Sequence, residues 1–189
     1  LVGSEMCISD RHYDAQKELT GWESPGFNAT EWHHAQETES PTETIKSQVM
    51  HPIRETARYT ATQCKKINDS CYVYHFPKNI AGVTELNVKG KKGTILRLKH
   101  GELLDKNGRV NMANIDYHYR PTDDSDPFQT DIVILSGKED SFMPKFNYKG
   151  FQFVEISSSA PIELSGENLI AIEMHSDVPA IGYLSLIHI

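Results

Sequence analysis

The chain has 189 residues, which is enough for one ordinary domain with an appended segment. Its formal net charge of -7 and its pI near 5.7 argue against nucleic acid and anionic membranes as partners, because both need a basic surface. No apolar run approaches the roughly 18 residues of a membrane-spanning helix, so none is predicted.

Residues 1 to about 67 are mostly polar and irregular. They open on Leu1, without an initiating methionine or an export signal, and we expect this to be a cut end. Trp22, Phe27 and Trp32 stand among turn-forming Gly, Pro and Asn residues. This spacing favours aromatic rings that pin a loop onto a neighbouring surface, and a sugar-stacking platform is the alternative. The acidic run Glu37–Glu43, rich in Ser and Thr, is typical of a linker.

From residue 53 onward the chain contains short runs that are rich in β-branched and aromatic residues, which predict strands. The predicted strands cover residues 53–64, 72–76, 83–89, 94–100, 130–137, 145–148, 151–156 and 168–175, with a short break at Lys149-Gly150. Residues 83–89 and 94–100 alternate with period two on either side of Gly90–Gly93, which predicts a hairpin. The side chains expected to be buried are Leu86, Val88, Leu96, Leu98, Ile170 and Ile172.

No segment carries a sustained apolar stripe at helical spacing. Many short strands, separated by a turn about every ten residues, predict an all-β fold. We therefore expect an antiparallel β-sandwich or jelly roll with an irregular N-terminal segment.

Three cysteines are present, Cys7, Cys64 and Cys71, so they cannot all pair with one another. Cys64 and Cys71 could pair across a turn, but we interpret all three as unpaired thiols. The absence of a CxxC pair argues against a structural zinc site. The cysteines leave the compartment, and hence the localisation, open.

Local motifs predict no catalytic residue, no metal site and no cofactor, and they leave the substrate-binding residues unknown. The nine histidines form no HxH or HExxH pattern. Asp105–Gly108 opens like a calcium loop but lacks the closing glutamate, so it predicts a turn. Asp123–Asp126 could bind a hard cation, or it could be a solvated loop. Gly90–Thr94 has the wrong spacing for a phosphate loop.

A longer pattern is more specific than any of these motifs. The run Tyr72–Val110 resembles the concanavalin-like domain of bacterial α-L-rhamnosidases, glycoside hydrolase family 78. The matching residues are Phe76, Asn79, Ala81, Gly82, Gly90, Gly93, Thr94, His100, Gly101, Glu102, Leu104 and Gly108. Phe146–Ile156 and Met174–Tyr183 resemble later motifs of that family, and Tyr13–Trp32 resembles the end of its N-terminal domain. Pro77, Lys78 and Val83 depart from the pattern.

The resemblance implies a division of the chain. Residues 1–52 would be the C-terminal end of the family's N-terminal domain with a linker, and residues 53–183 would be the concanavalin-like β-sandwich. The tail 184–189 does not resemble the family, and we expect it to be non-native. In the family, catalysis belongs to a helical α/α barrel that follows this β-domain and acts by an inverting mechanism.

Two hypotheses for function follow. In the first, the chain is a non-catalytic accessory sandwich that supports the catalytic α/α barrel of the same parent chain. The parent would be an α-L-rhamnosidase that hydrolyses terminal α-L-rhamnosides. In the second, it is a lectin-like module that binds rhamnose-containing glycans. An exposed aromatic platform beside polar groups would favour the second hypothesis, and a large apolar face without such a groove would favour the first.

Overall fold

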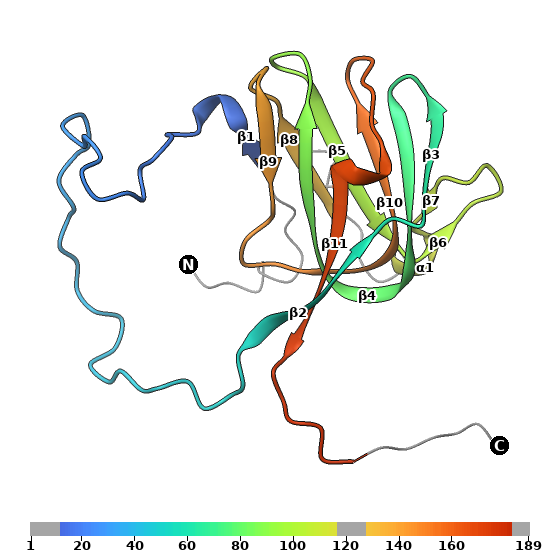
Figure 1. Ribbon diagram of the computed structural model, residues 1–189. Helices are drawn as coiled ribbons and strands as arrows, with labels where there is room; N and C mark the ends of the chain where they lie inside the picture. The colour runs from blue at the N-terminus through green and yellow to red at the C-terminus, as the bar shows by residue number, and fades with distance from the viewer. Residues whose placement is uncertain (1–11, 117–127, 183–189) are drawn as a thin grey trace.

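The computed structural model describes residues 12–116 and 128–182, and it is almost entirely β (Figure 1). Cys7, Asp123–Asp126 and the tail 184–189 lie outside the described residues. Nine strands join one sheet: β1 His12–Asp14, β2 Ile53–Thr60, β3 Gln63–Asn68, β4 Cys71–Lys89, β5 Ile95–Gly101, β8 Thr130–Ile134, β9 Glu139–Phe142, β10 Lys149–Ser158 and β11 Leu169–Ser176.

The smaller elements lie outside this sheet. They are the two-stranded sheet of β6 (Leu103–Leu104) and β7 (Val110–Asn111), helix α1 (Ala113–Asp116), and the 3-10 turns η2 (Ala15–Lys17) and η3 (Gly166–Asn168). In the described ranges no helix has the length and apolarity needed to cross a membrane.

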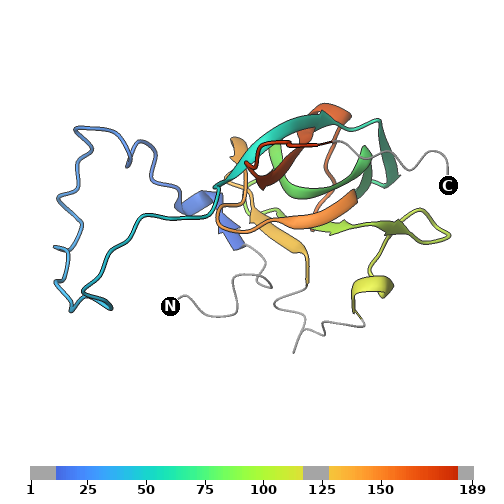
Figure 2. The same ribbon diagram turned by 90° about the horizontal axis from the view of Figure 1, so that it is seen from below.

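The main path of the sheet runs β1-β8-β5-β10-β4-β11-β2, while β3 and β9 each pair with β4. All neighbours are antiparallel except β1 and β8. Figure 2 shows the sheet curled so that its two halves face each other. The prediction of an all-β sandwich is confirmed.

Strand β4 joins the two halves of the sandwich. The sequence predicted two strands, at 72–76 and 83–89, but the chain forms one strand of 19 residues. Its first part pairs with β3 and β10, and its last part pairs with β11 and β9. At Gly82 a Cβ atom would collide with the carbonyl oxygen of Ile172, so β4 and β11 approach this closely only because glycine stands there.

The predicted hairpin between residues 83–89 and 94–100 is wrong. Strand β5 pairs with β8 and β10, and not with β4. The turn after Lys89 therefore carries the chain from one half of the sheet to the other. Gly93 adopts a φ of +79°, its N–H donates to the Leu135 carbonyl oxygen (2.8 Å), and the Leu135 N–H donates to the Thr94 carbonyl oxygen (2.9 Å). These bonds anchor the turn to the segment that follows β8.

The core fills the space between the two halves. Leu86, Val88, Leu96 and Leu98 belong to it as predicted. Side chains of this size contribute on the order of 2 kcal/mol each when fully buried. The core side chains of largest volume, all fully buried, are Tyr74, Phe76, Leu86, Leu96, Leu98, Leu135, Phe151, Ile156 and Leu169.

The predicted burial of Ile172 is confirmed, whereas that of Ile170 is wrong. Leu169 and Ala171 enter the core cluster, while Ile170 is only half-buried and Ile172 is buried without belonging to that cluster. The pairing of Leu169 with Leu86 is the reason, because it places the odd-numbered residues beside core residues of β4.

The predicted strand at 145–148 is also wrong. These residues form no strand, and Phe146 adopts a left-handed backbone with φ +67°. Strand β10 begins at Lys149, so the expected break at Lys149-Gly150 lies inside a strand. The sequence also missed β9, whose residues are mostly polar.

The N-terminal segment lies apart from the sandwich. After β1 and η2, residues 18–52 form no helix or strand, and almost all of their side chains are exposed. Figure 1 shows this stretch as a long loop that leaves the sandwich and returns at β2. Phe27 and Trp32 pack on each other, with ring centroids 5.5 Å apart, and do not pin the loop to the sheet.

Candidate functional site

Several glycines that match the rhamnosidase pattern are required by the fold. A Cβ at Gly90 would lie 2.5 Å from Leu135, and one at Gly101 would lie 2.5 Å from Val110. Gly108, like Gly93, has a φ of +79°, which L side chains rarely adopt. Five of the twelve residues that match the pattern are glycines, and the fold favours glycine at each of them.

The histidine of the matching run His100-Gly101-Glu102 (the HGE run) is a buried structural residue. His100 is fully buried and lies in edge contact with the ring of Phe151. Burial, together with the nearby Lys149 ammonium, lowers the pKa of His100 to about 4. The imidazole is therefore neutral at pH 7. Nδ1 donates to the Gln129 carbonyl oxygen (3.2 Å), so Nε2 accepts from the Thr84 hydroxyl (3.0 Å).

A buried ion pair lies beside this histidine. Lys149 Nζ is 2.7 Å from Asp131 Oδ1, and the two side chains are only 5% and 0% exposed. The Gln129 side-chain oxygen accepts from the Gly150 N–H (3.0 Å). These bonds hold the start of β10 against the start of β8. Removal of one partner from such a pair is costly because the other charge stays buried.

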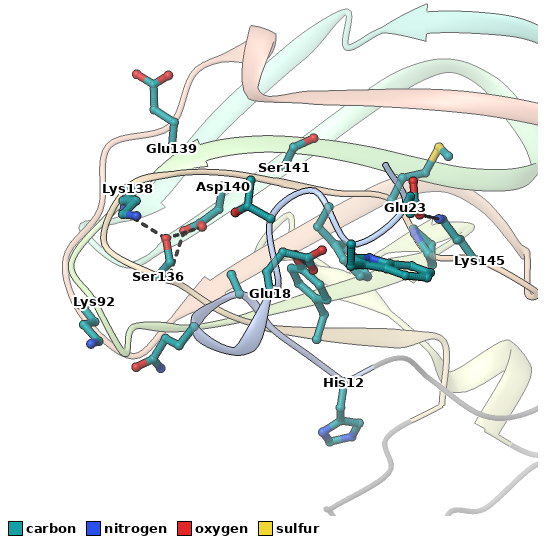
Figure 3. A pocket seen from close by; sticks show the side chains of 18 of the residues that line it. His12, Glu18, Glu23, Lys92, Ser136, Lys138, Glu139, Asp140, Ser141 and Lys145 are labelled. Carbon is teal, nitrogen blue, oxygen red and sulfur yellow. Dashed lines mark hydrogen bonds and ion pairs between the residues drawn. The ribbon is translucent and has the colours of Figure 1, made fainter. Parts of the chain in front are cut away.

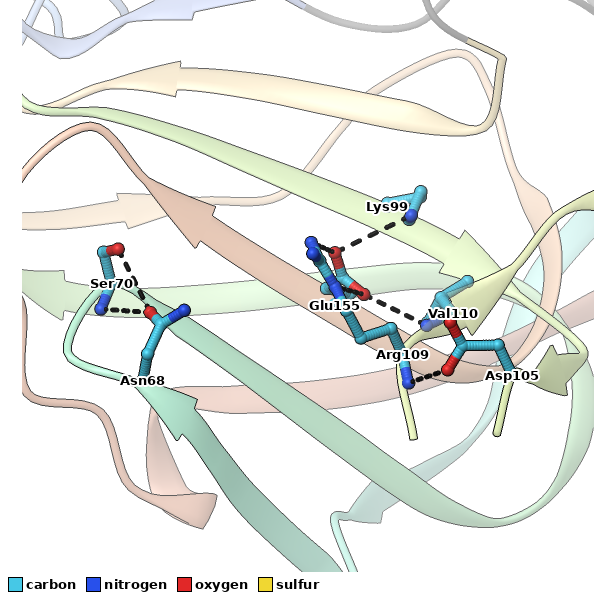
Figure 4. Close-up of polar contacts among 7 residues, drawn as sticks. All are labelled: Asn68, Ser70, Lys99, Asp105, Arg109, Val110 and Glu155. Atoms are coloured by element: carbon cyan, nitrogen blue, oxygen red, sulfur yellow. Dashed lines mark hydrogen bonds and ion pairs between the residues drawn. The ribbon is translucent and has the colours of Figure 1, made fainter. Parts of the chain in front are cut away.

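The second buried carboxylate binds a hairpin to the sheet (Figure 4). Glu155 on β10 is 3% exposed and accepts from Arg109 Nη2 (2.5 Å), Arg109 Nε (3.2 Å) and the Val110 N–H (3.0 Å). Lys99 Nζ lies 3.6 Å away. One carboxylate thereby fixes the β6–β7 hairpin over β10 and β5.

The hairpin turn at Asp105–Gly108 is confirmed. Asp105 Oδ1 accepts from the backbone N–H groups of Asn107 (2.8 Å) and Arg109 (2.9 Å). These bonds, led by the one from Arg109, lower the pKa of the Asp105 carboxyl. The turn is closed by the Asp105 carboxylate itself.

Glu102 completes the roles of the HGE run. Its Oε1 accepts from Asn79 Nδ2 (3.1 Å) on β4, and its Oε2 accepts from Asn114 Nδ2 (3.2 Å) on α1. The side chain thus links the bend of β4 to the short helix. In the part of the chain that the structure describes, no three His, Cys, Asp or Glu side chains gather as they would around a metal ion. Cys64 and Cys71 are both free thiols.

A groove of about 910 Å³ lies between the N-terminal segment and the end of the sandwich (Figure 3). One wall is built from β1, η2 and the residues up to Glu23, and the other from residues 136–146. Two exposed rings line it, Trp22 (49% exposed) and Phe146 (83% exposed). Tyr13, which packs on Phe142 with ring centroids 5.3 Å apart, joins the groove to the core.

Three pairs of polar side chains in the groove lie at hydrogen-bond or ion-pair distance from one another. The Tyr13 hydroxyl donates to Glu18 Oε2 (2.8 Å), and burial together with this bond raises the pKa of Tyr13 to about 12. The Ser136 hydroxyl donates to Asp140 Oδ1 (2.5 Å). Lys145 Nζ and Glu23 Oε1 lie 4.0 Å apart.

Sequence reasoning singled out Trp22 but missed Phe146. The sequence predicted a strand at Lys145–Tyr148. The chain instead turns at Phe146, where the backbone is left-handed, and the ring is left exposed. The groove combines segments more than 110 residues apart, and no local motif signals such a combination.

The curled antiparallel sheet and its required glycines define a β-sandwich of the concanavalin-like class. The family model for the bacterial alpha-L-rhamnosidase concanavalin-like domain matches residues 65–175, and the model for the alpha-L-rhamnosidase N-terminal domain matches residues 4–57. The chain belongs to the bacterial α-L-rhamnosidase family.

Individual relatives agree with this assignment. An α-L-rhamnosidase of Streptomyces avermitilis is 30% identical over 181 residues, which cover 95% of this chain and 16% of that protein. One from Formosa agariphila is 30% identical over 155 residues, covering 76% of this chain and 15% of that protein. The chain thus spans about a sixth of the length of these relatives.

Solved structures give the same picture. The crystal structure of the Streptomyces avermitilis α-L-rhamnosidase complexed with L-rhamnose superimposes with a TM-score of 0.77 at 30% identity, covering 92% of this chain and 16% of that one. The native enzyme from Aspergillus terreus gives 0.71 at 28% identity, with 90% and 19% covered.

Proposed function

We propose that this chain is an accessory β-sandwich of an α-L-rhamnosidase. In this proposal it packs against the catalytic α/α barrel of the same parent chain and has no catalytic activity of its own. The observation that carries the proposal is the use of its buried carboxylates. Within the described ranges, Asp131 and Glu155 are the buried acidic residues, and each is held in an internal ion pair.

The chemistry of the family's reaction explains why this observation matters. An inverting glycosidase needs two carboxyl groups on opposite sides of the scissile bond, roughly 6.5–9.5 Å apart, one of them a proton donor. Asp131 is paired with Lys149 beside the core, and Glu155 lies under the β6–β7 hairpin. Neither lines the groove. This use of the buried acids in the fold supports the proposal that catalysis belongs to another domain of the parent chain.

The proposal also accounts for the HGE run. His100 is sealed in the core and Glu102 is bonded to two asparagines, so both residues build the domain. Leu103 and Leu104 beside them remain 48% and 39% exposed on β6. Two adjacent exposed leucines on a hairpin are consistent with contact to a further domain.

A hydrolysis assay tests this proposal. The purified chain is incubated with 4-nitrophenyl α-L-rhamnoside, beside a longer polypeptide that also carries a family α/α barrel. We expect nitrophenol release from the longer polypeptide and none from the 189-residue chain. Release by the short chain that is abolished by substituting one of its own carboxylates, such as Glu18→Gln or Asp140→Asn in the groove, in protein shown to be folded, would place the catalytic site here and overturn the proposal.

A specific observation favours a second candidate function, a carbohydrate-binding module. The groove presents Trp22 and Phe146 beside carboxylate and ammonium groups, which is the exposed aromatic platform expected of such a module. We expect only weak binding of the single sugar L-rhamnose, because one ring cannot contact the whole of so large a groove. Calorimetric titration of the chain with L-rhamnose measures this.

A further inference from the structure

We propose that the groove between the β1–η2 segment and residues 136–146 is a binding site for a neutral oligosaccharide. The proposal deepens the second candidate function and is independent of the accessory role. The site combines the family's N-terminal segment with the sandwich, since one wall lies within residues 4–57 and the other within residues 65–175.

Two aromatic side chains of the groove are exposed, as are Trp32 and Tyr148 outside it, but only these two lie beside the groove's polar groups. Phe146 is 83% exposed and Trp22 is 49% exposed, while other large side chains such as Phe76 and Phe151 are fully buried. Aromatic rings offer a flat apolar face to a ligand. The C–H groups on one face of a pyranose ring are the apolar part of a sugar, and they stack on such rings.

The backbone at Phe146 supports the same interpretation. Its φ of +67° is rare for a bulky side chain, and strain of this kind is concentrated at functional sites. The ring gains no burial in return. The turn therefore holds an aromatic ring outward at the mouth of the groove.

The charges of the groove favour a neutral ligand. Four carboxylates line it, and three ammonium groups nearly balance them. They are Glu18, Glu23, Glu139 and Asp140 against Lys92, Lys138 and Lys145. An anionic glycan or a nucleic acid would need an excess of positive charge, which is absent from this lining.

The same groups can bond to hydroxyls. Glu23 and Lys145 lie 4.0 Å apart, and their side chains are 65% and 68% exposed. A pair this loose and this wet contributes little by itself. A sugar hydroxyl can donate to the carboxylate and accept from the ammonium at once, because a hydroxyl is both donor and acceptor.

The size of the groove favours more than one sugar ring. Its volume of about 910 Å³ lies at the upper end of the roughly 300–1,000 Å³ found for small-molecule sites. Trp22 and Phe146 come from opposite walls. An oligosaccharide can reach both rings, which agrees with weak binding of a single rhamnose.

The test uses the two tryptophans of the chain, Trp22 and Trp32. Trp32→Phe leaves Trp22 as the only indole, and the indole that it removes packs against Phe27 outside the groove. We expect the emission of this variant to change saturably when it is titrated with the neutral disaccharide rutinose, an α-L-rhamnosyl-glucose. Trp22→Phe, in which Trp32 is the only indole, should not respond.

Phe146→Ala in the Trp32→Phe background should weaken rutinose binding by about tenfold, which corresponds to 1.4 kcal/mol. Tyr148→Ala is the matched control, because Tyr148 is 54% exposed in the same segment but does not line the groove. It should change the affinity less than twofold. Both positions are exposed, so neither variant should unfold the chain.

Three results would overturn this proposal. They are the absence of a saturable change up to 50 mM rutinose (about 50 times the Kd of a 1 mM complex), equal losses in Phe146→Ala and Tyr148→Ala, and preferential binding of an acidic glycan such as oligogalacturonate. Amide exchange in the groove could also slow only in a longer polypeptide, with no response to rutinose. That result would assign the groove to contact with another domain and overturn this proposal. Hydrolysis of an aryl rhamnoside would leave this proposal intact while overturning the accessory role, so the two failures are distinguishable.

Discussion

The sandwich of residues 71–176 and the N-terminal stretch of residues 18–52 are held by different forces. The sandwich combines strand ladders with a sealed core that includes Leu86, Leu98 and Phe151. The N-terminal stretch has hydrogen bonds within local turns, such as Trp22 N–H to the Leu19 carbonyl oxygen and Trp32 N–H to that of Ala29. Its side chains remain exposed.

This difference shows that burial determines which part of the chain is structurally independent. Ordering one residue costs roughly 1–2 kcal/mol of backbone entropy, and the sandwich recovers this cost through buried apolar surface. Residues 18–52 bury too little surface to do so alone. Their aromatic residues are therefore available to a ligand or to another domain.

The largest effect is expected at the closest backbone approach in the sandwich. Gly82→Ala places a Cβ against the carbonyl oxygen of Ile172, so β4 and β11 must separate. We expect a loss of about 3 kcal/mol or more in the free energy of unfolding, measured by urea titration. Gly166→Ala is the matched control, because nothing lies within 4 Å of its added Cβ. Equal stability of the two variants would contradict the described contact.

The next effect is pH dependence from His100, whose pKa falls from 6.5 to about 4 on folding. The unfolded chain binds the proton first, so stability from this residue is fully present above about pH 6.5 and is lost as the pH falls towards 4. At 1.4 kcal/mol per tenfold change in proton affinity, the loss reaches about 3 kcal/mol. His100→Gln should have a shallower slope of unfolding free energy against pH over this range. An unchanged slope would show that other groups cause the dependence.

A smaller effect is expected where the β6–β7 hairpin meets the sheet. Glu155→Gln removes the charge that binds Arg109 and Lys99, and we expect a loss of about 2 kcal/mol, moderated because Arg109 is 48% exposed. Amide exchange at Val110 should also accelerate, since its N–H donates to Glu155. Glu55→Gln, which breaks the exposed pair with Arg58, is the control and should cost less than about 1 kcal/mol.

The smallest effect is expected in the N-terminal stretch. Trp32→Ala removes a ring that is 50% exposed and contacts Phe27, so the unfolding free energy should change by about 0.5 kcal/mol or less. A loss above about 2 kcal/mol would mean that this stretch contributes to the cooperative core.

The comparison also explains which features were predictable from the sequence. Strands β5, β8, β10 and β11 were recognisable because apolar residues recur in short runs between turns. Pairing was not, because alternation identifies a strand but not its neighbour, and β4 and β5 proved to have different partners. In β11 the residues at 169–172 are all apolar, so the pattern could not choose the inward face.

The roles of the motif residues were harder to predict than their family. Nothing local indicates that His100 is neutral and buried, or that Glu155 holds a hairpin, since both depend on partners distant in the chain. The groove depends on a turn at Phe146 that resembles a strand in composition. The boundary at residue 53 between the two predicted domains stays a prediction, although β1 already pairs with β8.

Amide hydrogen exchange over the whole chain tests the contrast between these regions most directly. We expect slow exchange across β4, β5, β10 and β11, where global unfolding is required, and exchange close to the unprotected rate throughout residues 18–52. In a longer family polypeptide, or with saturating rutinose, the residues around Trp22 should gain protection while the sandwich stays unchanged. Strong protection of residues 18–52 in the isolated chain, equal to that of β4, would contradict the account.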